Sequence, residues 1–230
     1  MLEHMKKGYW ILSLILLGIS NVFTLNAQKY KNSELSVEAR VQDLLSRMTL
    51  EEKVAQLRIF HANQGVESND AGELELSDNV RGRLKYGIAG IKNPGEHIAP
   101  LKAAKLNNEL QKYIIEHNRL GIPALFVTES YNGVDAAGCT YFGRPISSAA
   151  TFNPEMVQQI WDVVGREARF RGMHMCHSPE GDLVRDPRFG RMSETFGEDT
   201  YLTTQMVRSA VKGVQEDYVG QGNGTHIRAV

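Results

Sequence analysis

Short apolar segments alternate with longer amphipathic segments from Tyr86 onward, and this alternation is what most restricts the possible folds of the chain. Strand-like segments occupy residues 87–92, 124–128 and 173–178, and residues 226–230 begin a fourth. Between them, residues 101–117, 153–168 and 207–214 follow helical spacing, and Asn153 followed by Pro154 is typical of a helix start. Strands that alternate with helices of this length predict parallel βαβ units in an α/β protein.

Two architectures are built from such units: a doubly wound sheet and a (β/α)₈ barrel. No G-x-G-x-x-G sequence follows the first strand, which weakens the dinucleotide-binding version of the doubly wound sheet. A barrel needs about 250 residues, whereas the chain holds three units and the start of a fourth. We therefore expect residues 28–230 to form a partial (β/α)₈ TIM-like barrel, roughly its first half. Two short helices from Val37 and Leu50, the second capped by Thr49, are expected to precede it, with a loop over residues 62–79.

Residues 1–27 have the pattern of a secretory signal peptide. Lys6 and Lys7 precede an interrupted apolar run, and Leu25-Asn26-Ala27 resembles a cleavage site. The alternative, a membrane anchor, is disfavoured because the run is short and interrupted by polar residues. An exported protein, periplasmic or extracellular and without a stable membrane anchor after cleavage, is the resulting expectation.

The charge balance excludes one class of partner. The 230 residues carry a formal net charge of −1, with both signs interspersed, so no basic surface for nucleic acid is expected. Cys139 and Cys176 are the only cysteines, and whether they pair is left open.

In barrels, functional residues lie at the carboxyl ends of the strands and on the loops that follow. Glu129 directly follows the second predicted strand and precedes small and polar residues. A carboxylate can accept hydrogen bonds from two neighbouring sugar hydroxyls, which would fix the orientation of a sugar ring. The alternatives are a helix-start acid or a partner for a nearby arginine.

A long charged segment, residues 178–199, follows the third predicted strand. It contains Arg185, Arg188 and Arg191 at intervals of three, interspersed with acids such as Asp186. This density predicts an ion-paired loop that holds at least one arginine toward a pocket, although most of these residues would only brace the loop.

His174, Cys176 and His177 raise the possibility of a metal site. Alternation along a strand places His174 and Cys176 on one face and His177 on the other, so the three cannot easily converge on one ion. No metal site is expected.

Four stretches stand in order along the chain: VQDLLSRMTLEEKVAQL (41–57), RLGIPALF (119–126), ATFNPEMV (150–157) and RDPRFGRMSETFGEDTYL (185–202). Together they resemble the N-terminal domain of glycoside hydrolase family 3, the β-glucosidase and β-xylosidase group. The resemblance implies an exo-acting retaining β-glycosidase that removes terminal β-linked sugars from oligosaccharides or other β-glycosides, most simply a β-glucosidase, without metal or organic cofactor.

The resemblance also assigns roles to residues. Glu129 and Arg191 match positions that bind the glycone sugar, and Arg185, Asp186 and Arg188 match positions that brace the loop. The nucleophilic aspartate and the acid/base glutamate of the family would lie beyond Val230. No catalytic residue is therefore expected within this chain, which is expected to be inactive alone.

Two positions depart from the family pattern. Asn132 stands where the family usually has histidine, and Glu180 and Gly181 stand where it usually has two apolar residues. These departures keep open a noncatalytic carbohydrate-binding relative, besides a β-xylosidase or β-N-acetylhexosaminidase of the same family.

Overall fold

The structure is a computed structural model of the 230-residue chain, and it describes residues 28–69, 73–215 and 228–229. The chain divides into two compact units, Met1–Lys53 and Val54–Val230. The signal peptide predicted for residues 1–27 lies outside the described residues.

The described part of the first unit is helical. It contains η1 (Lys29–Lys31), α2 (Val37–Arg47) and the start of α3 (Leu50–Ala55). The Thr49 N–H donates to Glu52 Oε2 at 2.8 Å, and the Glu52 N–H donates to Thr49 Oγ1 at 3.3 Å. This reciprocal capping box satisfies two backbone donors that the first turn leaves free, and it confirms the predicted cap.

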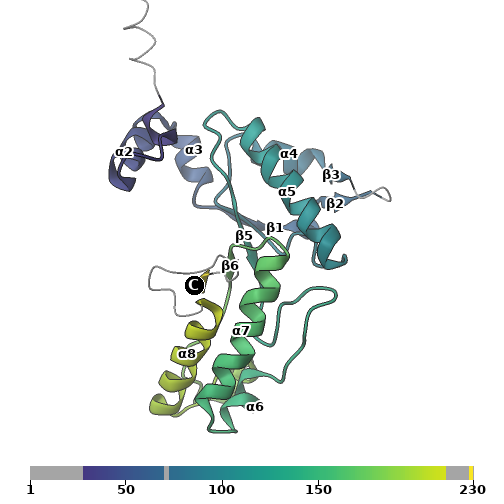
Figure 1. Cartoon of the computed structure of the whole chain (residues 1–230), viewed down its shortest axis with the longest axis vertical. Coiled ribbons are helices and arrows are strands. Elements are labelled where there is room, and N and C mark those ends of the chain that lie inside the picture. Colours follow the sequence, from purple (N-terminus) through teal and green to yellow (C-terminus); the bar gives the residue numbers. More distant parts are fainter. Residues whose placement is uncertain (1–27, 70–72, 216–227, 230) are drawn as a thin grey trace, which may run out of the picture. The chain divides into compact units, whose positions relative to one another are not determined.

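The second unit is built on a parallel sheet (Figure 1). Its strands, in spatial order, are β1 (Ile59–His61), β4 (Gly90–Lys92), β5 (Leu125–Thr128), β6 (Met175–Cys176) and β7 (Arg228–Ala229). Every neighbouring pair is parallel. The strands predicted near residues 87–92, 124–128 and 173–178 are thus confirmed, each shorter than expected, and β7 lies within the range predicted for the fourth.

The region before β4 contains one strand that was not predicted and one segment whose prediction as a loop is wrong. The sheet contains an additional strand, β1, which brings the number of parallel strands among the described residues to five. Residues 62–79, predicted as a loop, contain η2 (Ala62–Gln64), an antiparallel pair of β2 (Val66–Ser68) with β3 (Leu74–Leu76), and the start of α4 (Asp78–Leu84). Strands of three residues are too short to show the alternation of apolar and polar residues that would reveal them.

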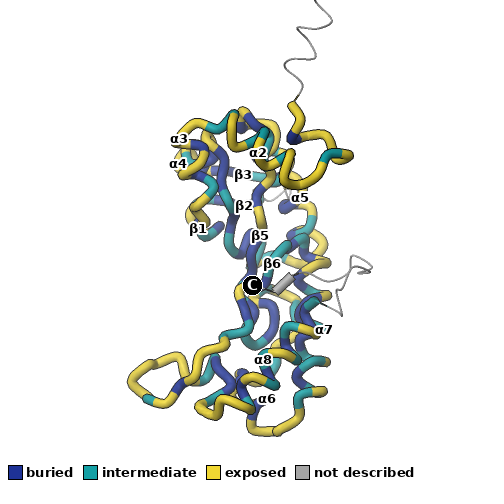
Figure 2. Tube along the Cα trace, turned by 90° about the vertical axis from the view of Figure 1, so that its left-hand side faces the viewer, coloured by how far each residue is buried: buried dark blue, intermediate teal, exposed yellow. Residues whose placement is uncertain are grey.

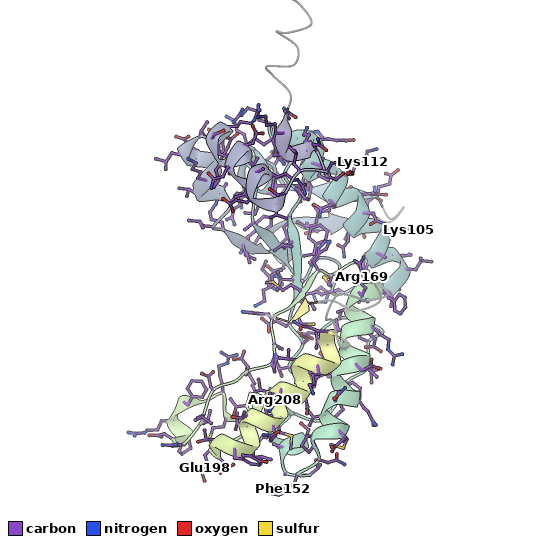
Figure 3. All side chains as sticks on the ribbon, turned by 60° about the vertical axis from the view of Figure 1, so that its left-hand side comes forward. Lys105, Lys112, Phe152, Arg169, Glu198 and Arg208 are labelled. Carbon is purple, nitrogen blue, oxygen red and sulfur yellow. The ribbon has the colours of Figure 1, made fainter. Side chains whose placement is uncertain are left out.

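The helices predicted at residues 101–117, 153–168 and 207–214 are confirmed as α5 (Pro100–His117), α7 (Pro154–Phe170) and α8 (Thr200–Gln215). The short helix α6 (Pro145–Ala149) was not predicted. Asn153 Oδ1 accepts a hydrogen bond from the Met156 N–H at 3.0 Å, which confirms the predicted start of α7. Figure 3 shows Lys105 and Lys112 projecting from α5 away from the sheet, while Leu106, Leu110 and Ile114 of the same helix are buried.

The core of the second unit lies between the sheet and these helices. Ile91 on β4, Phe126 on β5 and Cys176 on β6 are each at most 1% exposed, and Figure 2 shows β5 among the buried segments. Trp161 on α7 is buried, which confirms that it belongs to the core. The parallel sheet with its intervening helices confirms the predicted α/β class.

Helices α7 and α8 lie side by side (Figure 1) and approach closely at Gly213. A Cβ atom at this position would lie 2.3 Å from the Gln158 carbonyl oxygen. Only glycine allows the two helix backbones to come this close, so this residue fixes how α8 packs on α7.

Candidate functional site

Lys92, Glu129 and His177 converge at the carboxyl end of the sheet. They come from the ends of three adjacent strands: Lys92 is the last residue of β4, and Glu129 and His177 directly follow β5 and β6. Lys92 is in register with Val127, and Val127 with Met175. Because side chains two residues apart share a face of a strand, Lys92, Glu129 and His177 all lie on the same face.

The two basic side chains contact the same carboxylate oxygen. Lys92 Nζ forms an ion pair with Glu129 Oε1, and His177 Nδ1 lies 3.1 Å from that same atom. Since a carboxylate only accepts hydrogen bonds, the geometry assigns the proton of this contact to His177 Nδ1. Among the described residues, nothing forms a hydrogen bond or ion pair with Glu129 Oε2.

Asn93 fixes the backbone beneath this carboxylate. It is 4% exposed and has a positive φ of 52°, which asparagine tolerates better than most residues. Its Oδ1 accepts a hydrogen bond from the Glu129 N–H at 3.0 Å, and its own N–H donates to the Val127 carbonyl at 2.7 Å. The end of β4 thereby holds the main chain of Glu129 directly.

The environment favours the charged form of Glu129. Burial alone would raise the pKa of its carboxyl group, but hydrogen bonds from Lys92 and then His177 outweigh burial, and the pKa lies below its ordinary value. Glu129 is therefore a carboxylate at neutral pH.

A polar hollow of about 730 Å³ opens beside Glu129. Three of its lining side chains are carboxylates, and Lys92 is the single lysine or arginine among the described residues that line it. In the hollow wall, the Tyr141 hydroxyl donates to Asp135 Oδ1, and this hydrogen bond is the main cause that raises the pKa of Tyr141 to about 12. The lining includes His61, Lys92, Asn93, Glu96, His97, Glu129, Asp135, Cys139 and Tyr141. A surface so rich in hydrogen-bond acceptors suits a ligand with many hydroxyl groups.

Arg191, the second predicted sugar-binding residue, does not line this hollow. It precedes η4 (Met192–Glu194), and its side chain is 54% exposed. Arg191 Nη2 lies 3.0 Å from Glu180 Oε1 and 2.6 Å from Glu194 Oε2. The structure thus does not bring Arg191 and Glu129 together, and Glu180, which departs from the family pattern, is one of the carboxylates that hold Arg191.

The three residues predicted to brace the loop differ in their contacts. Asp186 caps η3 (Pro187–Phe189) by accepting the Arg188 N–H at 2.9 Å, and it pairs with the Arg188 guanidinium. This pairing lowers the pKa of Asp186. Arg185 forms no hydrogen bond or ion pair with the part of the chain that the structure describes. With Asp186 it lines a separate hollow of about 490 Å³.

His174, Cys176 and His177 have separate roles. His174 Nδ1 accepts the Phe126 N–H at 2.9 Å, so it belongs to the sheet. The Cys176 thiol is buried, and burial raises its pKa to about 12. Cys139 and Cys176 are both free thiols, and the described ranges contain no cluster of three His, Cys, Asp or Glu residues that could hold a metal ion.

Sequence reasoning did not assign roles at the site to Lys92, Asn93 or His177. Lys92 and Asn93 were visible as the polar end of an apolar strand, the same signal that identified Glu129. His177 belongs to the H-x-C-H sequence, which points toward a metal ligand and not toward a partner of Glu129. The position of each at a strand end could have linked all of them to Glu129.

Comparison with known proteins identifies the family. The family model described as "Glycosyl hydrolase family 3 N terminal domain" matches residues 49–226. A Formosa agariphila protein named "Putative beta-xylosidase" is 73% identical over 204 residues, which cover 89% of this chain and 27% of that protein. The periplasmic β-glucosidase of Salmonella typhimurium is 33% identical over 189 residues, which cover 81% of this chain and 22% of that protein.

Solved structures of β-glucosidases resemble this chain in fold. A β-glucosidase from Erythrobacter marinus matches with a TM-score of 0.74 at 30% identity, over 88% of this chain and 26% of that one. A β-glucosidase from Listeria innocua, solved in complex with isofagomine, matches with a TM-score of 0.66 at 29% identity, over 85% of this chain and 25% of that one. The chain therefore spans about a quarter of the length of the relatives it matches.

No helix within the described ranges combines the length and apolar character needed to cross a membrane. The family match extends over more than half of the residues, and the ordered motifs fall within or beside it. This chain belongs to glycosyl hydrolase family 3, and residues 49–226 match the N-terminal domain of that family.

Proposed function

We propose that this chain supplies part of the glycone subsite of an exported, exo-acting, retaining β-glycosidase. The observation that carries the proposal is the carboxylate of Glu129. It is ionised, anchored by Lys92, Asn93 and His177, and beside a polar hollow at the carboxyl end of a parallel sheet. One of its oxygens remains available for sugar hydroxyls.

The proposed architecture is roughly the first half of a (β/α)₈ barrel. Five adjacent parallel strands are compatible with that arrangement, as are the β-glucosidase structures that the chain resembles. Within a barrel, the ends of β4, β5 and β6 would form part of the active-site face. The nucleophile and the acid/base are assigned to no residue of this chain, and we propose that the chain alone does not hydrolyse glycosides.

Arg191 is proposed as a second glycone contact. In this role it would exchange at least one of its carboxylate partners, Glu180 or Glu194, for the sugar. Asp186 and Arg188 are proposed to brace the loop that carries it, and their ion pair supports this role. Arg185 is proposed to act with them.

Export is proposed from the signal-peptide pattern of residues 1–27. The names of two relatives, the periplasmic β-glucosidase of Salmonella typhimurium and the periplasmic β-glucosidase/β-xylosidase of Dickeya chrysanthemi, agree with a periplasmic or extracellular location.

The proposed substrates are β-glucosides, with β-xylosides as the second candidate. Several relatives at 29–33% identity are named β-glucosidases. The 73% identity to a protein named "Putative beta-xylosidase" supports β-xylosides as the second candidate. The two sugars differ by the hydroxymethyl group at C5, so the preference depends on the space around that carbon.

The test uses the protein translated from the complete reading frame that contains this chain. It is expected to release p-nitrophenol from the aryl β-glucoside or β-xyloside but not from the aryl α-glucoside. NMR should show the β-anomer as the first product, as retention requires. Absence of release from every β-glycoside would refute the proposal, and sugar binding without hydrolysis would identify a noncatalytic relative.

A further inference from the structure

We propose that Lys92 and His177 are positioning residues that hold Glu129 in one orientation and leave its Oε2 atom for the sugar. This inference rests on the proposed function and adds two residues to the glycone subsite. Neither residue was assigned a role by the sequence motifs.

The geometry at Glu129 restricts its carboxylate from two sides. Lys92 and His177 approach Glu129 from β4 and β6, the strands on either side of β5, and both contact Oε1. A rotation of the carboxylate that brought Oε2 toward either partner would exchange or break both contacts. With the Glu129 N–H also held by Asn93, the side chain is fixed at its backbone and at one oxygen.

The two oxygens of the Glu129 carboxylate differ in their partners. Each carboxylate oxygen can accept about two hydrogen bonds, and Oε1 already has two partners. Oε2 has none among the described residues, so it is the atom able to accept hydroxyl groups of a ligand. A carboxylate that is already oriented loses less conformational entropy when the sugar binds, and this strengthens binding.

The charges around the hollow make Lys92 important for the state of Glu129. The hollow contains the carboxylates of Glu96, Glu129 and Asp135, whereas Lys92 is the single lysine or arginine among its described lining residues. Loss of Lys92 would leave the Glu129 carboxylate near two acids without the lysine cation, and the pKa of Glu129 would rise. The carboxylate would also be held less firmly in its orientation.

A purely structural role does not account for these two residues. The side chains of Lys92 and His177 are 29% and 58% exposed, so neither fills the core. The Phe126, Cys176 and Ile91 side chains, which do form the core, are at most 1% exposed. Removing Lys92 or His177 is therefore expected to alter the site without unfolding the protein.

The experiment is a double-mutant cycle in the protein from the complete reading frame, assayed on its best aryl β-glycoside. Lys92→Met and His177→Ala are each expected to lower kcat/KM about tenfold to a hundredfold, since each removes a charge-assisted contact. In the Glu129→Ala background, the same substitutions should change kcat/KM less than about twofold, because they act through Glu129.

Conservative substitutions of His177 test whether the lost activity can be recovered. Asparagine places an N–H group near the position of histidine Nδ1, and glutamine places one near Nε2. His177→Asn is therefore expected to recover most of the activity and His177→Gln little of it. Lys105→Met, on the exposed face of α5 (Figure 3), is the matched lysine control and should leave activity unchanged.

Failure of the proposed function and failure of this inference give different results. A wild-type protein that hydrolyses no β-glycoside refutes the proposed function. An active wild type whose Lys92 and His177 variants retain full kcat/KM, or lose equal activity with and without Glu129, overturns this inference alone. Thermal melts of all variants exclude unfolding as the cause, and His177→Asn keeps the test decisive if His177→Ala fails to fold.

Discussion

Asn93 Oδ1 accepts a hydrogen bond from the main-chain N–H of Glu129 at 3.0 Å, and the Asn93 side-chain amide donates to Glu96 Oε2 at 2.9 Å. Asn93 is buried and has a positive φ. One residue at the end of β4 thus links the backbone of the proposed sugar-binding carboxylate to a second acid of the hollow.

Two substitutions separate the side-chain bonds of Asn93 from its backbone conformation. Asn93→Gly removes the bonds but accepts a φ of 52°, whereas Asn93→Ala removes them and adds strain of about 1–2 kcal/mol. The melting temperature should therefore fall in the order wild type, Asn93→Gly, Asn93→Ala. An alanine variant as stable as the glycine variant would contradict the assigned backbone conformation.

The ion pair between Lys92 and Glu129 should make stability depend on pH. The folded-state pKa of Glu129 is below its ordinary value of 4.5, so its contribution is fully present above pH 4.5 and is lost as the pH falls through the folded pKa. Lys92→Met should lower the melting temperature at pH 7, and the difference from wild type should shrink below pH 4.5. A difference that stays constant with pH would show that the lysine stabilises by packing alone; Lys105→Met is the control.

The hydrogen bond from Tyr141 to Asp135 should be visible in an alkaline titration. The pKa of Tyr141 is raised to about 12, mainly by this bond, from an ordinary value of 10.0. Asp135→Asn should bring the pKa back toward 10. The chain has eight tyrosines, so absorbance at 295 nm is compared with the same titration of Tyr141→Phe. An Asp135→Asn variant with an unchanged Tyr141 pKa would rule out the bond.

Gly213 allows the close approach of α7 and α8, so Gly213→Ala should be destabilising. Its added Cβ atom would lie 2.3 Å from the Gln158 carbonyl oxygen and 2.8 Å from Trp161 Cβ, and the overpacking is expected to cost about 1–3 kcal/mol. Gly82→Ala on α4 is the matched control, because a Cβ there meets nothing within 4 Å and should stabilise the helix by about 0.5–1 kcal/mol. Urea denaturation measures both, and equal stabilities would contradict the helix packing.

The parts of the fold that the sequence predicted are those with long periodic patterns or local caps. Helix α7 has an Asn153 cap, Pro154 at its start and a continuous apolar face, and each of these is a local property. Strand β1 was missed because three residues, of which Ile59 is exposed, carry no visible alternation. Its place in the sheet is set by pairing with β4, which is 29 or more residues away in the chain.

The residues of the site likewise fall into those that a local pattern identifies and those whose contacts depend on the fold. Glu129 was identifiable because it directly follows an apolar strand. Its partners Lys92 and His177 also stand at the ends of predicted strands, but their convergence on one carboxylate oxygen depends on the parallel register of three strands, which no local pattern encodes. The contact of Arg191 with Glu180 likewise depends on how the long loop folds back, which no local pattern encodes.

The central claim is that Glu129 binds the sugar through its carboxylate, and the most direct test is kcat/KM of Glu129→Gln on an aryl β-glucoside and β-xyloside. Glutamine keeps the size of the side chain but removes its charge, its ion pair with Lys92 and one acceptor position. Glu116→Gln on α5, where the acid is exposed and 4.0 Å from Lys112, is the matched control. Our account predicts a fall of about a hundredfold for Glu129→Gln, corresponding to about 3 kcal/mol of lost charge-assisted bonding, and no change for the control. Wild-type kcat/KM in a folded Glu129→Gln variant would contradict it.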